Sequence, residues 1–167
     1  MKCVNVTGNT VLASVVSWLR SALNFQPEQC YEVANPDEIP SVPIAGHWWC
    51  TVAGGDGQFV EGNQDASQCS EQTEVIVTAY TRIQTDMTDH AENLLHDPAR
   101  GCFEMKRRLL KALCGVQLVT PSGDLFLRQS VWASRSSPPR NGKHSETGEF
   151  IGMIQLAFRI EFDWDLS

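Results

Sequence analysis

The sequence of 167 residues has no long apolar run: nowhere do 18 apolar residues follow one another, and Met1–Gly8 holds no apolar core of signal-peptide length. These absences exclude an ordinary membrane-spanning helix and predict a soluble, unsecreted chain with no membrane partner. Positive charge is also scarce, because 13 Lys and Arg stand against 20 Asp and Glu, for a net charge of -7. This balance disfavours a protein that coats DNA nonspecifically.

The sequence also lacks the spacings that mark catalytic and metal sites. Its six cysteines include no CxxC pair, so we expect free thiols, and its four histidines lie far apart with no cysteine at zinc-finger spacing. The glycine-rich Gly54–Gly57 lacks the Lys and Ser/Thr of a phosphate-binding loop and is typical of a turn. We therefore expect no enzyme, no cofactor, no metal and no catalytic residue.

One cluster keeps an enzymatic alternative open. Asp86, Asp89 and His90 would share one face of a helix and could offer oxygen and nitrogen ligands to a divalent ion. Such a site would make the chain a small metal-dependent hydrolase. The favoured interpretation is that Asp86 caps the helix, Asp89 interacts with its positive N-terminal end, and His90 is solvated.

The composition that is present supports a folded core. Apolar residues make up 42% of the chain and charged residues 20%, which argues against wholesale disorder. The length fits one domain, so residues 1–167 are expected to form a single unit.

Helical periodicity appears in two main places. Apolar residues recur every three or four positions after the capping residues Asn9 and Thr10, which predicts a helix over Thr10–Asn24. A second stretch begins at Asp86 and restarts at Asp97-Pro98, with an apolar side that includes Phe103, Leu109, Leu110 and Leu113. Gly115 is expected to end it.

Several segments read as strands. These are Cys30–Val33, His47–Ala53, Glu74–Ile83, a hairpin over Val116–Leu127, and Val131–Ala133. The Glu74–Ile83 segment has β-branched residues on both faces and is therefore expected in mid-sheet. The neighbouring Trp48 and Trp49 must point to opposite faces if their segment is a strand.

The C-terminal segment carries the clearest pattern. From Met153 to Trp164, large apolar residues alternate with mainly polar ones, which predicts a long strand with one buried side and one side turned to water or a charged partner.

Two polar stretches interrupt this plan. Gly54–Thr73 is expected to be a long polar loop, either an excursion or a small hairpin, and Ser136–Glu149 a mobile arm outside the core. We expect deletion of Ser137–Thr147 to leave folding intact. The predicted fold class is α+β: a mixed, mainly antiparallel β-sheet flanked by two main helices, with this loop and this arm.

Basic residues are the candidate contact sites. The predicted helix carries Lys106, Arg107 and Arg108, for which a solvated face is favoured over phosphate contact. On or beside the predicted arm, four residues could order against an acidic partner or a neighbouring subunit: Arg135, Arg140, Lys143 and His144.

The order of segments resembles a known family. A capped N-terminal helix and a proline-interrupted passage precede Val75–Arg82, Asp86 and a helix through Leu109–Leu113; a Gly-Asp turn, a polar arm and the alternating Ile154–Leu166 follow. In this order the chain resembles the tail terminator (tail completion) proteins of long-tailed bacteriophages, over nearly its whole length from about Asn9.

The resemblance implies a structural virion protein that forms a hexameric ring, caps the tail tube at its head-proximal end and joins the tail to the neck. Its partners would be further copies of itself, the tail tube protein, the neck or connector protein and, in a contractile tail, sheath protein. DNA would pass through the lumen without specific binding, and assembly would take place in the host cytoplasm. A tube subunit or a neck stopper is the alternative within the same class.

Overall fold

The computed structural model describes residues 3–38, 48–64, 69–83, 95–99, 101–144 and 146–167. In this part of the chain the structure has two long helices, a short 3-10 helix and six strands. Their bounds, in chain order, are α1 Gly8–Leu23, η1 Pro27–Gln29, β1 Cys30–Glu32, β2 Trp48–Gln64, β3 Cys69–Ile83, α3 Cys102–Leu113, β4 Trp132–Ser136, β5 Arg140–Lys143 and β6 Phe150–Asp163.

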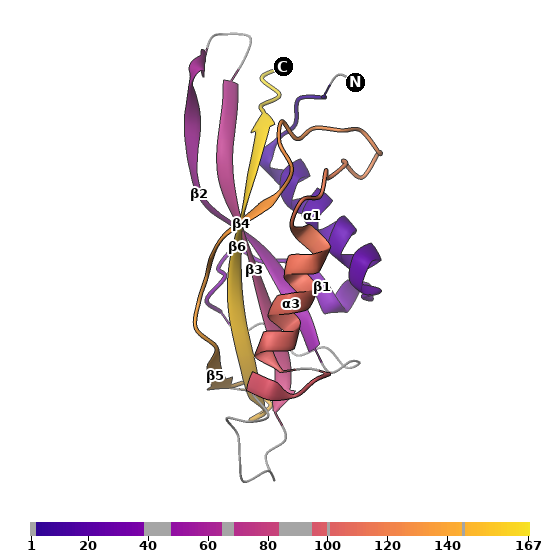
Figure 1. Ribbon diagram of the computed structural model, residues 1–167, viewed down its shortest axis with the longest axis vertical. Coiled ribbons are helices and arrows are strands. Elements are labelled where there is room, and N and C mark those ends of the chain that lie inside the picture. Colours follow the sequence, from indigo (N-terminus) through magenta and orange to yellow (C-terminus); the bar gives the residue numbers. More distant parts are fainter. Residues whose placement is uncertain (1–2, 39–47, 65–68, 84–94, 100, 145) are drawn as a thin grey trace.

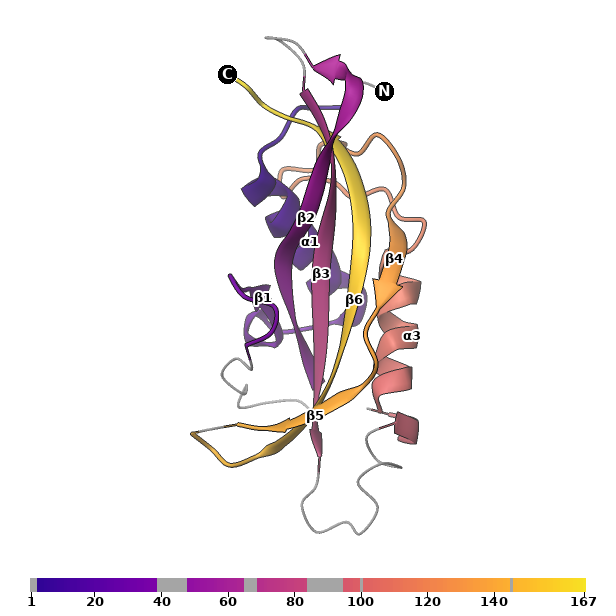
Figure 2. The same cartoon turned by 90° about the vertical axis from the view of Figure 1, so that its left-hand side faces the viewer.

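The strands form one sheet in the order β1-β2-β3-β6-β4, with β5 also paired to β6. Figure 2 shows β2, β3 and β6 side by side, with β1 at one edge and β4 at the other. Among the described strands, β1 and β2 run parallel, and the other pairs are antiparallel. The α+β class with a mixed, mainly antiparallel sheet is thus confirmed, as is the central place of β3.

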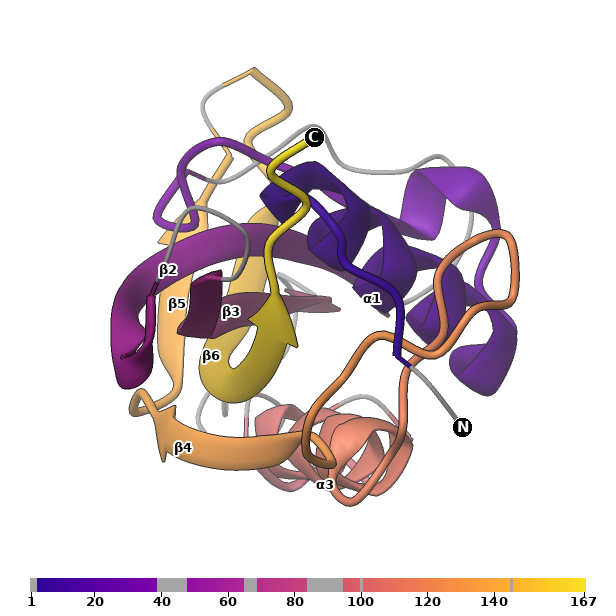
Figure 3. The same ribbon diagram turned by 90° about the horizontal axis from the view of Figure 1, so that it is seen from above.

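Both helices cover the same face of the sheet (Figures 1 and 3). Thr7 caps α1 through its side-chain oxygen, which accepts from the backbone N–H of Thr10, and Asn24 ends the helix in the left-handed region at φ 54°. The main core lies between the helices and this face. It includes Leu19, Leu109 and Phe158. Within the described residues, no helix is long and apolar enough to cross a membrane.

The alternation of β6 is confirmed on its apolar side. Ile154, Leu156, Phe158, Ile160 and Phe162 are all buried in the main core. The other side departs from the prediction, because most of it is covered too. A second cluster there consists of Trp49, Tyr80, Ile151 and Met153.

The two tryptophans behave as the alternation requires. Trp48 belongs to the main core and Trp49 to the cluster on the opposite face, where its ring stacks on Tyr80 with centroids 5.5 Å apart. We call the face opposite the helices the second face.

Of the two alternatives for the polar stretch Gly54–Thr73, an excursion or a hairpin, the structure shows the hairpin, as an extension of β2 and β3. β2 continues to Gln64 and β3 begins at Cys69, and the ladder between them runs from Trp48↔Thr81 to Gln64↔Cys69, with register shifts after Gly54 and Phe59. Figure 1 shows this hairpin extending above the helices. The two strands are held together here by hydrogen bonds between backbone groups, which polar residues form as well as apolar ones. Side-chain polarity alone therefore could not distinguish this hairpin from a loop.

The predicted mobile arm Ser136–Glu149 is also wrong in its central part. β5 pairs with β6 from Arg140↔Met153 to Lys143↔Phe150, and His144 is only 8% exposed. A short polar strand is held here by its backbone hydrogen bonds to a buried neighbour. This segment is therefore part of the folded unit.

The predicted apolar side of the second helix is confirmed in part. Phe103 was expected on the apolar side of its helix, but it is 48% exposed, whereas Cys102 and Met105 are fully buried in its place. Residues 102, 105, 109 and 113 define the buried stripe, and position 103 lies about 100° from it. The stretch that begins at Asp86, together with Asp89 and His90, lies outside the described residues.

Candidate assembly interface

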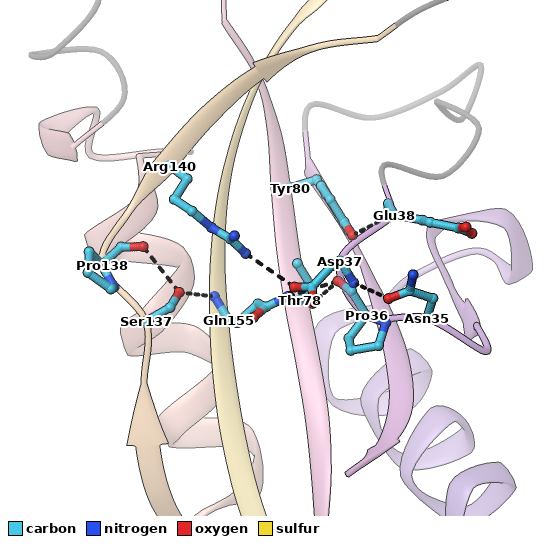
Figure 4. A network of polar contacts seen from close by, with 10 residues as sticks. All are labelled: Asn35, Pro36, Asp37, Glu38, Thr78, Tyr80, Ser137, Pro138, Arg140 and Gln155. Carbon is cyan, nitrogen blue, oxygen red and sulfur yellow. Dashed lines mark hydrogen bonds and ion pairs between the residues drawn. The ribbon is translucent and has the colours of Figure 1, made fainter.

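A short strap crosses the second face of the sheet. We give this name to Val33–Glu38, which follows β1 directly. Thr78 of β3 and Gln155 of β6 both donate to the carbonyl oxygen of Pro36, at 3.3 and 2.8 Å, and the Tyr80 hydroxyl donates to that of Glu38 at 3.1 Å (Figure 4). The strap therefore anchors two central strands through its backbone.

The strap is tied to β5 as well. Arg140 Nη2 lies 3.7 Å from Asp37 Oδ1, which also accepts a 3.0 Å hydrogen bond from Gln155 Nε2 (Figure 4). Ser137 completes the network, since its hydroxyl oxygen accepts from the Gln155 backbone N–H at 3.0 Å. The predicted contact residue Arg140 thus has an acidic partner inside its own chain.

A buried carboxylate organises the polar part of the second face. Glu74 of β3 is 9% exposed, and Arg135 Nη2 of β4 lies 2.8 Å from its Oε2. Its Oε1 accepts from the Ser134 hydroxyl at 3.0 Å and lies 3.8 Å from Arg159 Nε. A cleft of about 220 Å³ opens beside these groups, lined in addition by Asp56, Gly57, Gln58 and Gln72. Two arginines facing two carboxylates leave this cleft close to neutral.

The helix cluster also makes contacts within the chain. Arg107 and Arg108 both donate hydrogen bonds to Glu104 one turn away, at 2.7 to 2.9 Å. These hydrogen bonds lower the pKa of Glu104 to about 2, and those from Arg107 have the larger effect. The Arg108 guanidinium also lies 5.8 Å from the centre of the Trp48 ring. Lys106 Nζ donates to Ser136 of β4 at 3.0 Å, so α3 and β4 are joined at the edge of the sheet.

The remaining two candidate residues are at the β5 end. Lys143 Nζ lies 5.6 Å from the centre of the Phe150 ring. His144 Nδ1 accepts hydrogen bonds from the backbone N–H groups of Glu146 and Thr147 at 3.3 and 3.2 Å, and therefore orders the turn that leads to β6. The structure thus divides the seven candidates into an α3–β4 group, Lys106, Arg107, Arg108 and Arg135, and a β5 group, Arg140, Lys143 and His144.

Sequence reasoning missed two features of this surface. It did not find the strap, whose hydrogen bonds use backbone carbonyl oxygens and leave little trace in residue type. It also missed Glu74, the buried partner of Arg135. The sequence did contain a signal for Glu74. This acidic residue belongs to a strand that was predicted to be covered on both faces, and a covered carboxylate needs a partner.

Among the described residues, no group of three or more His, Cys, Asp or Glu is placed to hold a metal ion. All six cysteines are free. Burial raises the pKa of the Cys102 thiol to about 12, which makes it a poor nucleophile.

The sheet leaves two edges open. β1 pairs with β2 only from Cys50 to Val52, so in the described part of the chain no strand covers the outer edge of β2 beyond Val52. Gly54–Phe59 is exposed along this edge. At the opposite edge β4 pairs only with β6, and most of it is exposed. Open edges of this kind can accept another strand.

Comparisons with known proteins bear on the fold. No protein-family model matches the chain, and no curated protein matches it. Among solved structures, a chain of one described as "Virion of native gene transfer agent (GTA) particle" is similar, with a TM-score of 0.50 and 17% sequence identity. The similarity covers 93% of this chain and 96% of that chain. The two chains therefore share a fold over nearly their entire lengths.

Proposed function

We propose that the chain is a structural component of a phage-type virion, and specifically that it forms a ring that caps the tail tube at its head-proximal end and joins the tail to the neck. The observation that carries the proposal is the similarity in fold, over 93% of the chain, to a chain of a gene transfer agent virion. The order of segments along the sequence, which resembles the tail terminator proteins, gives the finer role.

The two open edges of the sheet provide the surfaces that a ring-forming subunit needs. Closed rings arise from head-to-tail contacts between identical subunits, which require two different surfaces on each copy. The outer edges of β2 and β4 are two such surfaces, at opposite ends of one sheet. A cap also needs one ring surface that binds the tube and another that does not repeat it, and tube growth then stops at the cap.

The proposal extends to partners and place. The ring is a hexamer that contacts the tail tube protein and the neck or connector protein, and sheath protein where the tail contracts. It assembles in the host cytoplasm and becomes part of the virion. DNA passes through its lumen without specific binding, and the net charge of -7 agrees in sign with a lumen that repels phosphate.

Electron microscopy tests the proposal. The purified protein, alone or mixed with its tube protein, should appear as closed rings, and on tubes the rings should sit at one end and stop further growth. Protein that stays monomeric under both conditions contradicts the proposal. Polymerisation into long tubes would instead identify a tube subunit, and binding to the connector without binding to tubes would identify a stopper.

A further inference from the structure

The outer edge of β2, together with β1, is acidic. Glu32 of β1 and Glu61 of β2 are exposed, and neither forms an ion pair with another described residue. Asp56 of β2 is not counted in this surface, because it lines the cleft that Arg135 also lines. The nearby cation Arg20 is occupied by the carbonyl oxygens of Cys30 and Pro27, at 2.9 and 3.1 Å. We call this surface the acidic edge.

The opposite edge, formed by β4 and α3, is basic. The Arg107 and Arg135 side chains are 65% and 61% exposed although each contacts a carboxylate, so most of their N–H groups still face solvent. Lys106, which bonds to Ser136 of β4, adds a third cation to the same edge. Figure 2 shows α3 beside β4 at one side of the sheet and β1 at the other. We call this surface the basic edge.

Each edge also carries an exposed aromatic ring. Phe59 of β2 is 55% exposed and Phe103 of α3 is 48% exposed, and both belong to the few large apolar side chains that the described residues leave in solvent. Phe103 lies one helical turn before Arg107 and so shares its side of α3. Aromatic and arginine side chains together are typical of the residues that anchor protein interfaces.

Strand direction and height make the two edges compatible. Because β2, β3, β6 and β4 alternate in direction, β4 of one copy set beside β2 of another is antiparallel to it. The ladder also connects Ser136 through Leu156 and Val77 to Val52, so β4 lies at the level where β2 becomes uncovered. A neighbour placed beside the sheet therefore meets an open stretch of strand.

We propose that the acidic edge of one copy binds the basic edge of the next, with β4 adding to the uncovered outer edge of β2. Glu32 and Glu61 of one copy then face Lys106, Arg107 and Arg135 of its neighbour. The occupant is a second copy of this chain, since opposite charges at the two ends of one sheet allow head-to-tail contact and oppose contact between like edges. This inference names the contact between neighbouring subunits in the proposed ring. It rests on the proposed function for the claim that successive contacts close into a ring.

Charge reversal tests this pairing in a way that a folding defect cannot imitate. One variant combines Glu32→Lys with Glu61→Lys, and a second combines Lys106→Glu with Arg107→Glu. Each alone places like charges at the contact, so self-association measured by analytical ultracentrifugation should weaken about tenfold or more. An equal mixture of the two variants restores opposite charges at every contact, as does a chain that carries all four substitutions, and both should regain most of the affinity.

Lys143→Glu, on β5 and outside both edges, is the matched control and should associate like the unmodified protein. Failure of the mixture and of the fourfold variant to recover, with each variant folded by circular dichroism, overturns the inference, as does a purified protein that does not self-associate at all. The two proposals can fail separately. Rings that cap tubes despite either double reversal would remove the edge pairing alone, whereas charge-dependent association into open filaments that never cap tubes would remove the tail role alone.

Discussion

At the scale of single residues, the polar contacts of the second face join segments that are distant in the chain. Arg135 reaches Glu74 across 61 positions, and Gln155 reaches Asp37 across 118. Each of these contacts connects a peripheral segment to a central strand. Their contribution should therefore appear in the stability of the whole sheet.

Replacing Glu74 tests this expectation. Glu74→Gln keeps the size of a side chain that is 9% exposed and its acceptor for Ser134, but it leaves Arg135 and Arg159 without their carboxylate. We expect a loss of about 1–3 kcal/mol in the free energy of unfolding, measured by urea denaturation. The exposed Glu146→Gln is the control and should change stability by no more than about 0.5 kcal/mol. Equal stability of the two variants would show that Glu74 does not organise this face.

The helix pair Glu104 and Arg107 gives a prediction about pH. Hydrogen bonds from Arg107 and then Arg108 lower the pKa of Glu104 from 4.5 to about 2. Because this pKa is lower in the folded protein, the ionised Glu104 stabilises the fold at pH values above 4.5. That stabilisation is lost as the pH falls through about 2. An NMR titration of the side-chain carboxyl carbon should show this low midpoint, and Arg107→Ala should move it upward. An unchanged midpoint in the variant would contradict the assignment.

The sequence predicted which residues are charged and exposed, but not their partners. Arg135 and Arg107 could be chosen as contact candidates from composition, yet their own-chain carboxylates depend on how β3, β4 and α3 pack. The pair of Glu104 and Arg107 was easier to predict from the sequence, because residues three positions apart on a helix are neighbours on its surface. Whether the seven candidates contact a neighbouring subunit stays a prediction.

At the scale of elements, side-chain periodicity predicted the helices and strands that pack into the core. It did not predict the strands that are held mainly by backbone hydrogen bonds. The helix α1 and the strands β1, β3 and β6 follow from apolar spacing. The hairpin extension of β2 and β3 and the strand β5 do not, because polar residues there pair through N–H and C=O groups that every sequence supplies.

Deletion of the β5 segment separates these two interpretations. Removing Ser137–Thr147 was expected to leave folding intact if the segment were a mobile arm. The structure reverses that expectation, since the deletion removes the strand that pairs with β6 from Phe150 to Met153, where Ile151 and Met153 are buried. We expect the free energy of unfolding to fall by roughly 1.5–3 kcal/mol, the value of exposing one large apolar side chain.

The control for this deletion keeps the backbone and removes the charges. Arg140→Ser with Lys143→Ser preserves the pairing of β5 with β6 and loses only surface contacts, so stability should change by less than about 1 kcal/mol. A deletion variant as stable as this control, by thermal or urea melting, would restore the mobile-arm interpretation.

At the scale of the whole molecule, the distribution of charge has a measurable effect. The carboxylates of the acidic edge and the cations of the basic edge are exposed, so added salt screens their attraction. Self-association should weaken as sodium chloride is raised from about 0.05 to 0.5 M, whereas the melting temperature of the dilute monomer should change little. Association that strengthens with salt would point to an apolar contact in place of the charged edges.

The long ladder between β3 and β6 has a mechanical consequence. It pairs Ser70–Ile83 with Phe150–Asp163 without a register shift and runs along the longest axis of the molecule, as Figure 1 shows. A pull applied along that axis to the opposite ends of these two strands loads the hydrogen bonds in shear, so they must yield together and not one after another. A subunit built around such a ladder resists stretching most strongly along one direction, and single-molecule pulling along and across the strands would measure that anisotropy.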